Sequence, residues 1–151
     1  MKKLLSIILI LSLFTSVLCS CRREYNAYSI LYEIVSSYGG EGVVYSPSIT
    51  EGNDGYIRDG LLEQIYLFSG DFPEDYAVFL NCRPDFSSEC GVFICSDAEM
   101  TNMVEEMCIE RVRLLCQGDP RGFVKRSRNI VFYSTMKDRE SIEKIFNETI
   151  R

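Results

Sequence analysis

The sequence predicts a single α+β domain, in which a small mostly antiparallel sheet of three to four strands has helices packed on one face. Three observations lead to this prediction. The chain has 151 residues, which suits one domain. Segments with a helical period alternate with short apolar runs of strand length. No internal repeat or low-complexity linker divides the chain, so residues 26–151 are expected to fold as one unit.

Four segments carry the apolar periodicity of amphipathic helices. They are residues 26–38, 60–68, 96–117 and 138–150. The longest is expected to begin at Ser96 or Asp97, both N-cap residue types, and to stop at Gly118. Asp59 is the expected cap of the short second helix.

Three apolar segments rich in β-branched and aromatic residues are predicted strands. The first two cover residues 76–82 and 91–95, and the polar residues 83–89 between them indicate an antiparallel hairpin. The third covers residues 129–135, and residues 43–45 are a candidate short strand inside a polar loop. Because the hairpin segments are almost continuously apolar, we expect both of their faces to be partly covered.

The first twenty residues have the composition of a signal peptide. Lys2 and Lys3 precede an uncharged apolar stretch from Leu4 to Leu18. This stretch is shorter than the roughly 20 residues needed to span a bilayer, but it suits the apolar region of a signal peptide. We therefore expect residues 1–20 to be removed on export. An uncleaved membrane anchor is the alternative.

The residues around the expected cleavage site resemble the lipobox of bacterial lipoproteins. Leu18, Ser20 and Cys21 match that pattern, whereas Cys19 departs from its usual small or β-branched residue. We expect Cys21 to be lipidated and residues 21–25 to form a tether, with two acyl chains holding the protein stably on the outer face of the cytoplasmic membrane. The alternative is a secreted protein cleaved before Ser20.

The charge of the chain argues against nucleic acid as a partner. The leader holds Lys2 and Lys3 and no acidic residue, so the rest of the chain has 14 basic and 22 acidic residues and a net charge of −8. Such a domain repels phosphate backbones at long range. The chain has no histidine, which removes the commonest general base and metal ligand.

Cysteine is the most unusual residue type in this chain, with seven copies. If Cys19 is removed and Cys21 is lipidated, five remain, so at least one lacks an intramolecular partner. Cys82 and Cys90 are the candidate disulfide, because we expect them to lie opposite each other at the loop end of the hairpin. Without a Cys-x-x-Cys pair, no metal site is predicted. The remaining cysteines can equally be small buried apolar residues.

Three charged segments have a functional interpretation and a plainer one. Residues 51–55 look like a calcium turn but lack the ligand spacing of an EF-hand, which favours a surface turn. Asp71 with Glu74 and Asp75 could act as acid and base at a sugar, although such pairs arise by chance in an acidic chain. The basic residues in 121–128 could meet an anionic partner, but a solvated connection before a strand is preferred.

The layout resembles a known family. The residues that carry the resemblance are 76–79, 90–93, 110–115 and 129–133, together with the expected lipidated amino terminus, the opening helix and the closing helix. They are similar to the uncharacterised small lipoproteins of Gram-positive anaerobes grouped as domain-of-unknown-function family 4358. The resemblance implies an α+β architecture and an anchored location, and it brings no catalytic residue.

These features together predict an exported module without enzymatic activity. We expect no catalytic residue and no cofactor, and we expect the module to bind an envelope component or a protein. A thiol-based redox or metal-handling envelope lipoprotein is the first alternative, because five cysteines remain. A carboxylate-dependent envelope hydrolase is the second alternative.

Overall fold

The computed structural model describes residues 25–38, 40–58, 60–68, 70–82 and 88–151. The predicted signal peptide, Cys21 and Asp59 lie outside these ranges. Within them, the helices are α2 (Ala27–Tyr38), α3 (Leu61–Tyr66), α4 (Ala98–Cys116) and α5 (Arg139–Thr149). The strands are β1 (Gly42–Tyr45), β2 (Asp75–Asn81), β3 (Glu89–Ile94), β4 (Phe123–Ser127) and β5 (Ile130–Ser134).

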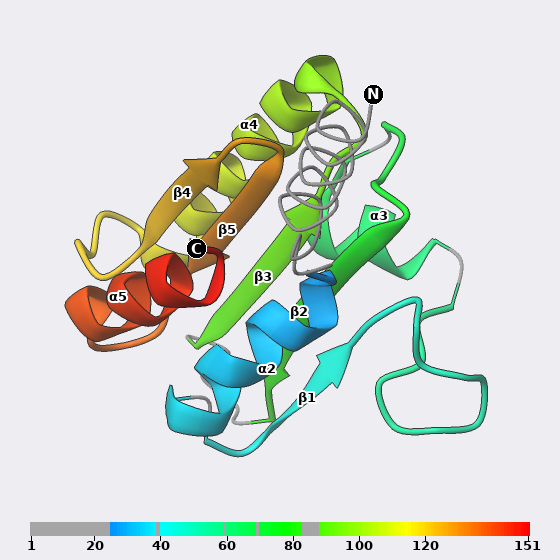
Figure 1. Ribbon diagram of the computed structural model, residues 1–151, viewed down its shortest axis with the longest axis horizontal. Helices are drawn as coiled ribbons and strands as arrows, with labels where there is room; N and C mark the ends of the chain where they lie inside the picture. Colours follow the sequence, from blue (N-terminus) through cyan, green and yellow to red (C-terminus); the bar gives the residue numbers. More distant parts are fainter. Residues whose placement is uncertain (1–24, 39, 59, 69, 83–87) are drawn as a thin grey trace, which may run out of the picture.

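The strands form one sheet in the order β1-β2-β3-β5-β4, and every neighbouring pair is antiparallel (Figure 1). The predicted hairpin is confirmed, because β2 pairs with β3 along its length, with Phe79 opposite Cys90. The α+β class is confirmed as well. The strand count is five rather than three to four.

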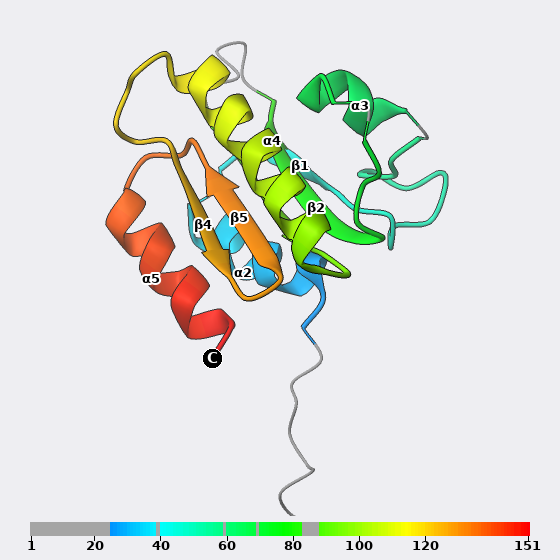
Figure 2. The same cartoon turned by 90° about the horizontal axis from the view of Figure 1, so that it is seen from above.

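Helices cover both faces of the sheet, so the prediction of helices on one face is wrong. Alternate residues of β2 and β3 point in opposite directions. Phe79 and Val92 join a core with α2 and α5, whereas Val78 and Phe93 join a second core with α3 and α4. Figure 2 shows α4 lying across the sheet on the side away from α2. The unbroken apolar runs of the central strands require this double cover.

The first core is built from α2 and α5, which pack against each other as well as against the sheet. Asn26 begins α2, because its side chain accepts a hydrogen bond from the Ser29 amide at 2.7 Å. Both carboxylate oxygens of Asp75 accept from the Ala27 amide, at 3.1 and 3.2 Å. Asp75 therefore fixes the start of α2 to strand β2.

The second core is closed by α4, whose ends agree with the sequence prediction. The Asp97 side chain accepts from the Met100 amide at 2.8 Å, as an N-cap does. At the other end Gln117 and Gly118 both have positive φ, the conformation that terminates helices. None of the described helices is long and apolar enough to cross a membrane.

Strand β4 occupies the segment predicted to be a solvated basic connection, which is a correction. As an edge strand it carries charge instead of an apolar run. Lys125 and Arg126 are consecutive, so they point to opposite sides of the sheet. Lys125 pairs with Glu143 of α5 at 3.4 Å, and Arg126 pairs with Glu105 of α4 at 3.2 Å. These two basic residues thus bind acidic side chains of the same domain.

Candidate functional site

A buried glutamate lies at the first residue of β3. Glu89 is 3% exposed, which is rare for a carboxylate and requires a compensating charge. Arg111 of α4 supplies it through two parallel bonds, Nε to Oε1 at 2.7 Å and Nη2 to Oε2 at 2.8 Å. This bidentate geometry is the strongest form of an arginine–carboxylate pair.

Two buried tyrosines extend this pair. The Tyr133 hydroxyl donates to Glu89 Oε1 at 2.8 Å, and the Tyr66 and Tyr133 hydroxyl oxygens are 2.7 Å apart. Because Tyr133 gives its proton to Glu89, Tyr66 must donate to Tyr133. Burial raises the pKa of both tyrosines well above 10, and the negative charge of Glu89 raises both pKa values further.

The same arginine holds α3 in place. Arg111 Nη1 donates to the Ile65 carbonyl oxygen at 2.7 Å. The network therefore joins α3, α4, β3 and β5, and its polar atoms bond to one another. We interpret this network of Glu89, Arg111, Tyr66 and Tyr133 as structural and call it the clasp. The Glu89 carboxylate already accepts hydrogen bonds from Arg111 and Tyr133 of the same chain.

The sequence patterns do not predict this clasp, although one signal for it is present in α4. Arg111 follows Val104, Met107 and Cys108 at helical spacing, on the buried stripe of α4. An arginine in such a stripe needs a buried acidic partner, and Glu89 stands at the edge of an apolar strand.

The cysteines are free thiols at the positions that the structure describes. Cys82 is exposed, whereas Cys90, Cys95, Cys108 and Cys116 are buried. Burial raises the pKa of the Cys90 and Cys108 thiols, so both stay protonated and unreactive. Phe79, not Cys82, lies opposite Cys90. The predicted placement of Cys82 opposite Cys90 is therefore wrong, and the register gives the candidate disulfide no support.

The remaining charged candidates do not come together as a reactive site. Asp75 is occupied by the start of α2, and its carboxyl pKa is raised by burial although the Ala27 amide lowers it. Asp71 and Glu74 point to solvent as exposed side chains. Across the described ranges, no three acidic, cysteine or histidine residues are grouped as metal ligands.

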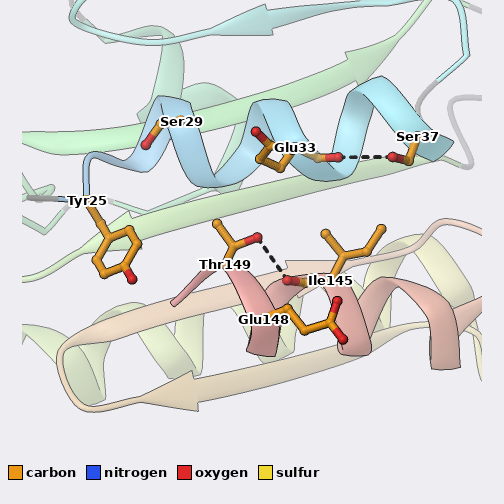
Figure 3. Close-up of a pocket in the computed structure, with 7 residues that line it drawn as sticks. All are labelled: Tyr25, Ser29, Glu33, Ser37, Ile145, Glu148 and Thr149. Atoms are coloured by element: carbon orange, nitrogen blue, oxygen red, sulfur yellow. Dashed lines mark hydrogen bonds between the residues drawn. The ribbon is translucent and has the colours of Figure 1, made fainter. Parts of the chain in front are cut away.

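A groove of about 570 Å³ opens between α2 and α5, on the face of the sheet away from the clasp (Figure 3). One wall is a stripe of α2, whose four-residue spacing places Ser29, Glu33 and Ser37 on one face, together with Tyr25 two residues before the helix. The other wall belongs to α5. The lining residues are Tyr25, Ser29, Glu33, Ser37, Ile145, Glu148 and Thr149.

The groove combines two acidic side chains with hydroxyl groups. Glu33 comes from α2 and Glu148 from α5, so the carboxylates stand on opposite walls (Figure 3). Ser37 and Thr149 lie beside them, each bonded to a carbonyl oxygen of its own helix. The sequence predicts Tyr25 to be part of the tether. In the structure Tyr25 instead packs partly buried against the first core, at one end of the groove.

Comparisons with known proteins find no match to a family model, a curated protein or a solved structure. The resemblance to the small lipoprotein family of unknown function therefore stays a prediction, and the site must be interpreted from its own chemistry.

Proposed function

We propose that this protein is an exported, non-enzymatic binding module, anchored to the membrane through Cys21, which binds its partner in the groove between α2 and α5. The groove is the observation that carries the proposal. Its volume lies in the range of known ligand sites, and its carboxylates are not neutralised by any described cation within ion-pair distance. Glu89, by contrast, is bound by Arg111.

The position of the groove along the chain suits an anchored protein. Tyr25 lines the groove and follows Cys21 by four residues. Four extended residues span at most about 14 Å, so lipidation of Cys21 would hold this end of the groove close to the membrane surface. The partner would then be a component of that surface or a protein next to it.

Site-specific photo-crosslinking in intact cells tests the groove. A photoreactive residue is placed at Ser29 or Ser37, and the control position is Glu106, exposed on α4 on the other side of the sheet. We expect one adduct of defined mass from the groove positions and none from position 106. Equal adducts from both faces, or adducts from position 106 alone, would contradict the proposal.

Mass spectrometry of the native amino terminus tests the anchor separately. We expect a terminal Cys21 that carries acyl chains. A free Ser20 terminus would instead establish a secreted protein, and the groove would then have no fixed position at the membrane.

A further inference from the structure

Among the helical glutamates that the structure describes, some have an ion-pair partner and others, the two groove glutamates included, do not. Glu105, Glu110 and Glu143 each have an arginine or lysine within 4 Å. No such partner is recorded for Glu33 or Glu148 among the described residues. Glu148 also lines a neighbouring hollow together with Lys144 and Arg151, neither of which lines the groove. The groove therefore carries two negative charges in a domain that is already acidic.

The hydroxyl groups of the groove have already used their protons. Ser29 Oγ donates to the Asn26 carbonyl at 2.9 Å, Ser37 Oγ to the Glu33 carbonyl at 3.3 Å, and Thr149 Oγ1 to the Ile145 carbonyl at 2.9 Å. A hydroxyl that has donated its proton offers only lone pairs to a ligand. With the two carboxylates, these groups present hydrogen-bond acceptors, and the Tyr25 hydroxyl can donate or accept. A ligand that matches this lining must supply the donors.

The groove also has an apolar surface next to its acceptors. Tyr25 and Ile145 are partly buried side chains that pack on the core and line the groove. Lysine and arginine side chains complement this lining. Each has an aliphatic stem that packs on apolar surface and a cationic head that donates hydrogen bonds. The Tyr25 ring can also attract a cation.

From these observations we propose that the groove binds a lysine- or arginine-bearing peptide segment of a partner protein. This inference rests on the proposed binding function and names its ligand class. Helix α2 has 12 residues and is about 18 Å long. An extended segment of about five or six residues spans that length, at roughly 3.3 Å per residue. Such a segment can place cationic heads at both Glu33 and Glu148 while its stems pack on Ile145.

Fluorescence anisotropy with the mature protein tests the ligand class. The probes are a labelled six-residue peptide of alternating lysine and alanine, the same peptide with every lysine acetylated, and a glutamate–alanine peptide. We expect binding of the first peptide alone, because acetylation keeps the stem but removes the charge. Binding of the acetylated or glutamate peptide as tight as that of the lysine peptide would overturn the inference. Tighter binding of an amine-bearing glucosamine oligomer would also overturn it, in favour of a glycan.

Matched variants locate the binding. Glu33→Gln/Glu148→Gln removes two charges from the groove, and Glu99→Gln/Glu106→Gln removes two charges from exposed positions of α4. We expect the groove variant to bind the lysine peptide about tenfold more weakly, the size of two exposed ion pairs, and the α4 variant to bind it as the parent does. Equal weakening in both variants would mean unspecific charge attraction and would overturn the inference. If the lysine peptide does not bind but photo-crosslinks still form from the groove positions, the proposed ligand class is wrong and the proposed binding function stands.

Discussion

Single residues decide the stability of the second core through the clasp of Glu89, Arg111, Tyr66 and Tyr133. The Glu89 side chain is 4% exposed and that of Arg111 is 19% exposed. Removing one partner of such a pair leaves a buried charge without compensation, and the cost depends on which charge remains. The carboxylate is the more deeply buried partner, so losing the arginine is the more serious change.

We predict that Arg111→Met lowers the free energy of unfolding by about 3–5 kcal/mol. Glu89→Gln should cost less, because the guanidinium left behind still reaches solvent. The double variant should cost less than the sum of the two, since neither charge is then left alone. Urea denaturation of the four proteins measures this. Arg111→Met within about 1 kcal/mol of the parent would contradict the role of the clasp.

The tyrosines predict a dependence on alkaline pH. The pKa of Tyr66 and of Tyr133 is raised in the folded state, whereas an unfolded tyrosine titrates near 10. The folded state therefore keeps protons that the unfolded state loses, and stability is fully present below pH 10 and falls as the pH rises above it. Tyrosinate absorbance should show at least two of the nine tyrosines, Tyr66 and Tyr133, ionising only as the protein unfolds. Ionisation of all nine while the circular dichroism stays native would refute this.

At the scale of elements, the turn between β1 and α3 depends on a close approach of the backbone. Gly55 and Gly52 both have positive φ, of 90° and 92°. A Cβ atom at Gly55 would lie 2.1 Å from the Val44 carbonyl oxygen of β1, whereas one at Gly52 would meet nothing within 4 Å. An alanine at either position would therefore adopt the same strained backbone conformation. Only at position 55 would its Cβ atom also collide with Val44.

We predict that Gly52→Ala costs about 1 kcal/mol, the strain of a positive φ, and that Gly55→Ala costs at least twice as much. Unfolding in urea compares the two variants directly. Equal costs would show that the backbone of β1 moves aside freely, contrary to the close approach of Gly55 to the Val44 carbonyl oxygen.

The elements also show how far the sequence determines the fold. The ends of α4 and the hairpin of β2 and β3 follow from local signals, a cap at Asp97 and two apolar runs. Strand β4 was missed because an edge strand with Lys125 and Arg126 has no apolar pattern. The sequence does not predict the second helical layer. Helical periodicity shows which side of a helix is buried, but it does not show which face of the sheet that helix covers.

The candidate site illustrates the same limit. Glu33 belongs to the polar face of α2, opposite the predicted apolar stripe. That face becomes one wall of a groove only because α5, over one hundred residues later, packs beside α2. The Glu89–Arg111 pair likewise joins residues 22 positions apart, a contact that local patterns do not encode.

At the scale of the whole molecule, the burial of the cysteines distinguishes a binding protein from a thiol-based redox protein. A redox protein needs an accessible thiol of low pKa, usually near a second one. Three of the four buried thiols are instead enclosed by the two cores, with Cys90 in the first and Cys95 and Cys108 in the second.

We predict that a thiol reagent modifies one group quickly in the native mature protein, Cys82, and the four buried cysteines only after unfolding. The variant Cys82→Ser should abolish the fast reaction and leave the slow ones unchanged. Two or more fast thiols, or a disulfide found without reductant, would favour the redox alternative.

The central claim is that the groove between α2 and α5 is the binding surface of this protein. Amide chemical shifts of the isotope-labelled mature protein, titrated with the lysine–alanine peptide, test it most directly. We predict that the largest shift changes fall on Ser29, Glu33, Glu148 and Thr149, with little change along α3 and α4. Changes centred on α4 or on the β4 edge would contradict the claim.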